Sequence, residues 1–275
     1  MRIGVSAPLR HSSPEEWVQK LKNWGCSCAI FPTDYREEES VIRRYAELAE
    51  ENDIVIGEVG AWCNPLAPER KERECAMERC IGQLRLADAI NARCCVNITG
   101  AAGPRWDGAY RGNFTKEHYS EIVRSIREII DAAKPERTWY TIEPMPWMVP
   151  MGPKEYKKLL EDVDRERFAV HMDLANMINN VERYFFADEF IEECFDLLGQ
   201  QIKSCHIKDA KLGGEFYCHI EQVACGEGTL NLERYAARMQ EVDEDMTVYI
   251  EHLKTEEEYP EAMKYMYGRL GKFWY

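Results

Sequence analysis

Short apolar runs alternate with longer amphipathic segments along the whole chain. Runs rich in Val, Ile, Cys and aromatic residues are typical of buried strands, and segments with apolar residues at i, i+3 and i+4 are typical of helices. The expected strands cover residues 3–7, 29–32, 54–62, 94–98, 139–143, 168–173, 202–208 and 248–251. The expected helices cover residues 14–25, 39–51, 68–90, 116–133, 153–163, 186–198, 230–240 and 256–270.

This strict alternation predicts parallel strands joined by right-handed helical crossovers. Eight strand–helix units in 275 residues predict one closed α/β barrel, of the (β/α)8 or TIM type, as a single domain over residues 1–275. An open doubly wound sheet is the alternative. It is less favoured because no Gly-x-Gly-x-x-Gly turn follows the first strand and no change in composition marks a second domain. The longest loops, residues 100–112 and 209–229, both follow strands.

Composition and charge narrow the class of protein. Hydrophobic residues make up 45% and charged residues 31%, as in folded soluble proteins. The net charge of −14 opposes general nucleic-acid binding, which needs clustered Lys and Arg. We find no apolar run long enough for a bilayer and no leader sequence, so we expect no membrane association and a cytoplasmic protein. The 11 cysteines lack paired zinc spacing and are expected to be reduced.

Four consecutive predicted strands each end on a residue type that binds metals, namely Glu143, Asp173, His206 and Glu251. In a closed barrel the carboxyl ends of the strands meet at one mouth, so these side chains are expected to converge. Three carboxylates held together repel one another unless a cation lies among them. The sequence therefore predicts one divalent metal ion. Oxygen ligands with one imidazole favour Mn²⁺, with Mg²⁺, Co²⁺ or Zn²⁺ also possible.

Several motifs in the second half resemble one known family, the sugar-phosphate isomerases and epimerases with a xylose-isomerase-like barrel. The motifs are Ile142-Glu143-Pro144, the segment from His171-Met172-Asp173 to Asn176, Cys205-His206-Ile207-Lys208-Asp209, and Gly226-Glu227-Gly228-Thr229-Leu230. The resemblance implies that the four residues named above hold the metal and that a sugar carbonyl and neighbouring hydroxyl chelate it. It also implies that the metal acidifies the adjacent C–H bond, and that Glu143 and Glu251 move the proton.

Asn176 departs from the pattern of the ketose epimerases that the chain resembles. Those enzymes place a histidine three residues after the aspartate of the sixth strand, where it contacts the sugar. Asparagine can form a hydrogen bond with a hydroxyl but cannot transfer a proton at neutral pH. The departure weighs against 3-epimerisation of a free ketose, and leaves room for isomerases and for inosose-type dehydratases.

Other polar or aromatic residues near the strand ends are candidates for roles at the mouth. Lys208 shares the inward face with His206; we expect it either to hold a substrate oxygen or phosphate, as a catalytic residue, or to pair with Asp209 or Glu251. The candidates for substrate contact are Glu58, Trp62, Asn97, His171, Asn176 and His219. For His171 a buried neutral core histidine is the alternative, for His219 a solvated loop residue, and for Trp62 simple loop packing.

Two readings from other classes compete with a carbohydrate enzyme. A DNA-repair endonuclease of this fold would need a three-zinc cluster with more histidines than these six supply, and the acidity opposes DNA. A sugar-binding subunit that needs a partner protein is left open by the sequence. The aromatic residues among positions 265–275 allow a homo-oligomer contact, although such a tail more often packs the last helix against the first unit and closes the barrel.

Overall fold

Each predicted apolar run forms a strand in the computed structural model, which describes residues 1–7 and 9–275. The eight strands of the main sheet are β1 (Arg2–Val5), β2 (Cys28–Ile30), β3 (Val55–Gly60), β4 (Cys94–Asn97), β5 (Trp139–Ile142), β6 (Phe168–Asp173), β7 (Ile202–Ile207) and β10 (Thr247–Ile250). They follow one another in the order β1-β10-β7-β6-β5-β4-β3-β2, and all their pairings are parallel. The predicted barrel is confirmed.

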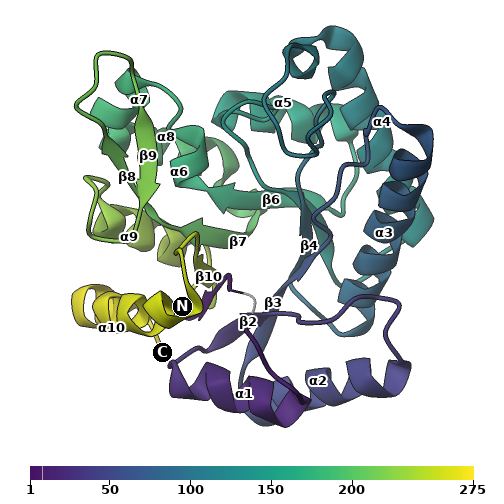
Figure 1. The fold of residues 1–275 in the computed structure, drawn as a ribbon, viewed down its shortest axis with the longest axis vertical. Helices are drawn as coiled ribbons and strands as arrows, with labels where there is room; N and C mark the ends of the chain where they lie inside the picture. The colour runs from purple at the N-terminus through teal and green to yellow at the C-terminus, as the bar shows by residue number, and fades with distance from the viewer. Residues whose placement is uncertain (8) are drawn as a thin grey trace.

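Helices surround the strands on the outside (Figure 1). They are α1 (Pro14–Asn23), α2 (Glu39–Glu51), α3 (Arg70–Ala89), α4 (Lys116–Ala133), α5 (Pro153–Val163), α6 (Leu174–Met177), α7 (Val181–Phe185), α8 (Ala187–Leu198), α9 (Leu232–Val242) and α10 (Tyr259–Leu270). Single 3₁₀ turns lie at Arg111–Phe114, Gly199–Gln201, Glu256–Glu258 and Gly271–Phe273. Helix α1 begins as its sequence predicts, with Pro14 in the first turn and the Ser13 side chain accepting a hydrogen bond from the Glu16 amide.

The barrel closes where β1 meets β2, by a looser contact than the other strand pairs. The Ser27 amide donates to the Ile3 carbonyl at 2.8 Å, and the Ile3 amide donates to the Ser27 hydroxyl at 3.1 Å. Gly4 allows this approach: a Cβ there would lie 2.4 Å from the carbonyl oxygen of Cys28. Strands β1 and β2, the two ends of the sheet order, are thus held together at a point where no side chain fits.

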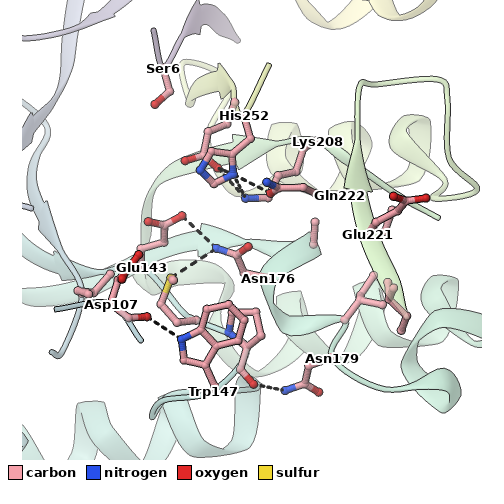
Figure 2. Close-up of a pocket in the computed structure, with 18 of the residues that line it drawn as sticks. Ser6, Asp107, Glu143, Trp147, Asn176, Asn179, Lys208, Glu221, Gln222 and His252 are labelled. Carbon is pink, nitrogen blue, oxygen red and sulfur yellow. Dashed lines mark hydrogen bonds and ion pairs between the residues drawn. The ribbon is translucent and has the colours of Figure 1, made fainter. Parts of the chain in front are cut away.

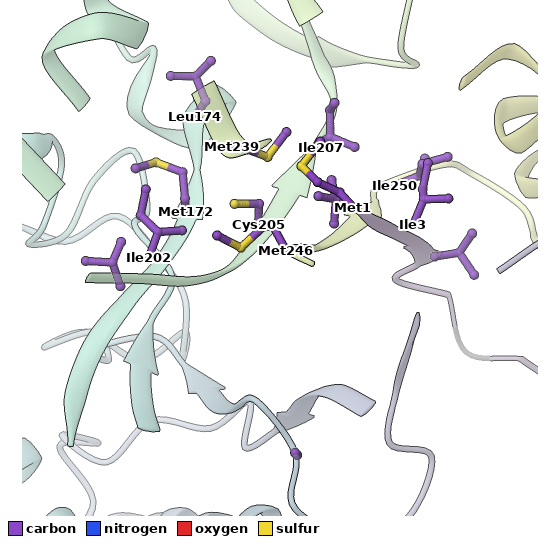
Figure 3. Packing of buried hydrophobic residues seen from close by; sticks show 14 of the residues in the cluster. Met1, Ile3, Met172, Leu174, Ile202, Cys205, Ile207, Met239, Met246 and Ile250 are labelled. Atoms are coloured by element: carbon purple, nitrogen blue, oxygen red, sulfur yellow. The ribbon is translucent and has the colours of Figure 1, made fainter. Parts of the chain in front are cut away.

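Side chains alternate between the two faces of the strands, as the period of two requires. Met172, Cys205 and Ile207 point outward and pack with Met239 of α9 in the layer between strands and helices (Figure 3). His171, Asp173 and His206 point inward, toward the barrel axis. The inward face therefore carries the polar groups, and burial of the outward face supplies the hydrophobic stabilisation.

The long loop after β7 contains an antiparallel hairpin that the sequence did not predict. Strands β8 (Asp209–Leu212) and β9 (Ile220–Val223) form their own two-stranded sheet. The Asp209 carboxylate joins the hairpin's two ends, because it accepts hydrogen bonds from the amides of Ala210, Gly226 and Leu230 at 2.8, 3.1 and 2.9 Å. Gly226 has a φ of +93°, a backbone conformation that glycine adopts without strain.

Two further expectations concern the membrane and the cysteines. Across residues 1–7 and 9–275, no helix combines the length and the apolar character needed to cross a bilayer. All 11 cysteines are free thiols, and most are buried. The scattered cysteines therefore act mainly as small apolar side chains in the core.

Candidate metal centre

Four neighbouring strands bring the predicted ligands to the carboxyl end of the barrel. Glu143 directly follows β5, Asp173 ends β6, His206 lies near the end of β7, and Glu251 directly follows β10. In the strand register Asp173 pairs with His206, and Tyr249 also pairs with His206, which sets the side chains at similar heights. One ligand atom from each of the four lies within 4.8 Å of the others, and all four residues are buried.

The geometry centres on one ring nitrogen of His206. Its Nδ1 atom lies 3.2 Å from Glu143 Oε1, 3.2 Å from Glu251 Oε1 and 3.8 Å from Asp173 Oδ2. Lys208 Nζ stands at the side of this group, 2.7 Å from Asp173 Oδ2 and 2.6 Å from Glu251 Oε2. Of the two roles expected for Lys208, the pairing with Glu251 is therefore present, and its ammonium also faces the pocket.

The charges of this cluster are unbalanced. Burial and the nearby charge of Glu251 raise the pKa of Glu143 to about 7. Burial alone would raise the pKa of Asp173 as well, but Lys208 and His206 outweigh it and the pKa is lowered. Burial would lower the pKa of His206, but the charges of Glu251 and Glu58 outweigh it and raise the pKa, so the three carboxylates share the Lys208 ammonium and the His206 ring. A divalent cation among their oxygens would remove the repulsion on Glu143, and oxygen donors with one imidazole are a ligand set such ions accept. The residues present fit a divalent metal.

A second buried group supports His206 from below. Glu58 and His171 are fully buried, with Glu58 Oε1 3.0 Å from His171 Nε2. Glu58 Oε2 lies 3.5 Å from His206 Nε2, so the carboxylate stands behind the ring nitrogen that faces away from the cluster. Burial would raise the pKa of Glu58, yet the two imidazoles outweigh it and lower the pKa below its usual range. Glu58 and His171 are not among the residues that line the pocket; the structure places them behind His206 and not at the substrate contact that was expected for them.

A pocket of about 760 Å³ opens above the cluster. Glu143, Glu251 and Lys208 form part of its floor, and Asn176, Trp62 and His219 line it as expected for substrate contacts. Figure 2 shows Lys208, Gln222 and His252 on one side of Asn176, and Trp147 and Asp107 on the other. Most of the lining residues that the sequence did not single out lie in loops, where no periodic pattern marks a side chain as facing inward; they include Trp106, Asp107, Trp147 and His252, while Gln222 lies in the short strand β9.

A sequence profile of one protein family, described as the xylose isomerase-like TIM barrel, matches residues 18–269. The chain belongs to this family. Comparison with curated protein sequences finds no match. Among solved structures, a probable 3-DHS dehydratase from Bacillus anthracis is similar with a TM-score of 0.74 at 16% identity, covering 98% of this chain and 100% of that one.

Two epimerases share the xylose isomerase-like fold with this chain. A 3-keto-D-glucoside 4-epimerase from E. coli has a TM-score of 0.71 at 14% identity, and the match covers 98% of this chain and 99% of that one. A D-psicose 3-epimerase from Clostridium cellulolyticum H10 has a TM-score of 0.66 at 15% identity, covering 96% and 89%. At these identities the likeness shows the fold alone.

Two asparagines of this xylose isomerase-like barrel have different surroundings. Asn176 donates from Nδ2 to Glu143 Oε1 at 3.2 Å and from its amide to Asp173 Oδ1 at 3.0 Å, so it holds two members of the cluster while facing the pocket. Asn97 is fully buried; its Nδ2 donates to Cys80 Sγ, and its Oδ1 accepts from the Cys63 amide at 3.0 Å. The structure therefore places Asn97 against the loop after β3 and not in the lining of the pocket, where a substrate contact was expected.

Proposed function

We propose that this chain is a divalent-metal-dependent isomerase or epimerase of a small sugar, sugar phosphate or cyclitol. The observation that carries the proposal is the buried group of three carboxylates and one imidazole at the floor of an open pocket. Sugar epimerases are among the solved structures with this fold, which agrees with the proposal. The proposed reaction is proton transfer at the carbon next to a carbonyl.

In the proposed mechanism Glu143, Asp173, His206 and Glu251 hold the metal. When bound, the ion supplies Lewis acidity, which polarises the substrate carbonyl and makes the neighbouring C–H bond acidic. Glu143 and Glu251 both face the pocket, so either carboxylate can accept a proton from a sugar carbon placed between them. Asn176 holds the Glu143 side chain through its 3.2 Å hydrogen bond, and this fixes the direction of that carboxylate.

Lys208 serves the same proposed reaction in two ways. Its ammonium neutralises Asp173 and Glu251, and it lies at the pocket floor, where it can donate to an oxygen that gains negative charge. We favour Mn²⁺ as the ion, since the ligand set is mostly carboxylate.

Dehydration is the second candidate reaction, and the placement of His252 favours it. His252 Nδ1 lies at the pocket wall, 2.7 Å from Gln222 Oε1 and 3.2 Å from Lys208 Nζ. An imidazole at this position can give a proton to a departing hydroxyl after a carboxylate has removed the neighbouring proton. A dehydratase is also among the solved structures that share the fold.

Metal content tests the central claim directly. We expect purified chain dialysed against Mn²⁺ to retain the ion in stoichiometric amount, and Asp173→Asn to lose it, because Asn lacks the charge but can still cap α6. Glu221→Gln is the matched control, since Glu221 lines the pocket outside the cluster and its variant should keep the ion. Elemental analysis after dialysis gives the measurement. Equal metal content in wild type and Asp173→Asn would remove the proposal.

Solvent deuterium separates the two reactions. The Mn²⁺-loaded chain is incubated in D₂O with a panel of ketoses, ketose phosphates and inososes, and products are identified by mass spectrometry and NMR. The product of an isomerase or epimerase differs from the substrate in elemental formula only by deuterium in place of a carbon-bound hydrogen, whereas the product of a dehydratase has lost water. Turnover by size-exclusion fractions of the pure chain would also show that no partner protein is needed.

A further inference from the structure

Three tryptophans form one wall of the pocket. Trp62, Trp106 and Trp147 all line it, and they come from the consecutive loops that follow β3, β4 and β5. Trp62 and Trp147 also pack on the same small apolar cluster of Ile98, Ala101 and Met148. Indole rings in a ligand pocket offer flat apolar faces, which suit the C–H face of a sugar ring or an aromatic ring.

The positions of these tryptophans are set by specific contacts. Trp62 has a φ of +39°, a backbone conformation that is costly for a bulky residue, and its indole occupies the space of a Cβ at Gly60, 2.1 Å from that ideal position. The Trp147 indole N–H donates to the Asp107 carbonyl at 2.7 Å (Figure 2). Buried Asn113 donates to the Trp147 carbonyl at 3.2 Å and accepts from the Ala102 amide at 2.8 Å. These bonds tie the loops after β4 and β5 into one rigid wall.

The aromatic wall is continuous with the cluster of carboxylates. Met145 packs on the tryptophan cluster, and its sulfur lies 3.9 Å from Asn176 Nδ2. The same nitrogen donates to Glu143 Oε1 at 3.2 Å. A ligand bound at Glu143 therefore also lies beside the indole wall. At about 760 Å³ the pocket lies in the range of roughly 300–1,000 Å³ that takes drug-sized ligands, which is more space than one hexose fills.

The charges around the pocket oppose a phosphorylated ligand. Asp107, Glu143, Glu221 and Glu251 line it. Its Lys and Arg side chains, among the described residues, are Arg105 and Lys208, and both are already paired: Arg105 with Asp107 at 2.8 Å, and Lys208 with Asp173 and Glu251. A phosphate here would meet acidic groups without a free cation to bind it.

We propose that the pocket takes a neutral glycoside of at least two rings, with the sugar that bears the carbonyl at the carboxylate cluster and the second ring, a sugar or an aryl group, on the wall of Trp62, Trp106 and Trp147. The proposal rests on the function proposed above and narrows its substrate class. Contacts of the second ring supply binding energy away from the reacting carbon. This energy can orient the first sugar at the carboxylate cluster.

Equilibrium binding to the Mn²⁺-loaded full chain tests this without any need for turnover. The probes are cellobiose, maltose and p-nitrophenyl β-D-glucoside as two-ring ligands, with glucose, methyl glucoside and glucose 6-phosphate as one-ring ligands. Calorimetry gives Kd, and ¹⁵N-labelled indole signals report on the tryptophans. We expect at least one two-ring ligand to bind about tenfold or more tightly than every one-ring ligand, with shifts of the Trp62 or Trp147 indole signal.

Variants assign the effect to the wall. Trp106→Ala should weaken two-ring binding about tenfold and change one-ring binding less than twofold, because Trp106 is partly exposed and its loss leaves the cluster intact. Trp139→Ala is the control: this half-buried indole lies at the start of β5, at the opposite end of the strand from Glu143, and its loss should change neither affinity. Equal affinity for one-ring and two-ring probes, absence of binding by every two-ring probe, or tighter binding of glucose 6-phosphate would overturn the proposal. Metal content of the same samples reports separately on the proposed function.

Discussion

The two ring nitrogens of His206 have different surroundings. Nδ1 faces three carboxylates, while Nε2 faces the carboxylate of Glu58 at 3.5 Å. In metal sites a carboxylate behind a ligating imidazole orients the ring and increases its basicity. Glu58 Oε1 in turn lies 3.0 Å from His171 Nε2, so the groups behind His206 extend two residues below the cluster.

Glu58→Gln should therefore weaken metal binding while the four ligands stay in place. We expect a loss of roughly 10–100-fold in Mn²⁺ affinity, the usual cost of removing such a support. Competition with a fluorescent chelator gives the affinity, and Glu221→Gln serves as the control on the pocket wall. An unchanged affinity in Glu58→Gln would show that the contact with His206 is only packing.

The four cluster residues were predictable, whereas their support was not. Asp173, His206 and their two partners stand at strand ends, and the strand period alone places them at the mouth. Glu58 and His171 share the inward face with the cluster residues, but how deep they lie depends on the stagger of strands far apart in sequence. His171 lies two residues before Asp173, so its side chain points the same way one level lower, and burial there excludes it from the pocket.

At the scale of elements, the end of α3 is joined to the start of β5 by one side chain. Asp88 Oδ1 accepts hydrogen bonds from the amides of Glu136, Arg137 and Thr138 at 2.9, 2.7 and 3.1 Å. Burial would raise the pKa of Asp88, but these amide donors outweigh it, and the pKa is lowered. The bonds fix the entry to β5, the strand that carries Glu143 at its other end.

Asp88→Asn should lower the free energy of unfolding on the order of 1 kcal/mol at pH 7, because a charged acceptor is replaced by a neutral one. A carboxylate with a lowered folded-state pKa stabilises the fold above its unfolded pKa, and this stabilisation is lost as pH falls through the folded value. The difference from wild type should therefore shrink in acid. Urea unfolding at pH 7 and at pH values below the usual Asp range measures it.

Glu47→Gln provides the baseline for Asp88→Asn, since Glu47 is an exposed carboxylate on α2. If the two variants show the same stability at every pH, the Asp88 contacts do not stabilise the start of β5.

Sequence reasoning missed the β8–β9 hairpin, as well as the short helices α6 and α7. The hairpin strands have only four residues each, and Glu221 and Gln222 stand at the centre of β9, so the alternation of polar and apolar residues is too short to predict strands. The barrel strands were visible because both of their faces are buried, which makes them continuous apolar runs. Of the tryptophan wall, Trp62 was a candidate from the sequence, whereas Trp106 and Trp147 were missed because loops have no period that reveals which way a side chain points.

At the scale of the whole molecule, the barrel depends on its seam between β1 and β2. Gly4→Ala should open this seam, because the added Cβ would lie 2.4 Å from the backbone oxygen of Cys28, which cannot move aside cheaply. We expect a loss of about 2 kcal/mol in the free energy of unfolding, within the range for overpacked sites. Urea denaturation followed by circular dichroism gives the value.

Gly268→Ala is the matched control, because Gly268 lies within α10 and a Cβ there meets nothing within 4 Å. This variant should be neutral, or more stable by roughly 0.5–1 kcal/mol through helix propensity. If Gly4→Ala has the same midpoint of urea unfolding as the wild type, the seam tolerates a side chain.

The hairpin has a consequence for how such a protein diversifies. Strands β8 and β9 form hydrogen bonds with each other and not with the barrel sheet, and the Asp209 carboxylate joins the two ends of the hairpin. Mutations within the hairpin therefore leave the hydrogen bonds of the barrel sheet in place. Yet this segment supplies Gln222, His219 and Glu221 to the pocket. Descendants of this chain can thus acquire new ligand preferences through mutations in the β8–β9 hairpin, while the carboxylates of the cluster stay unchanged.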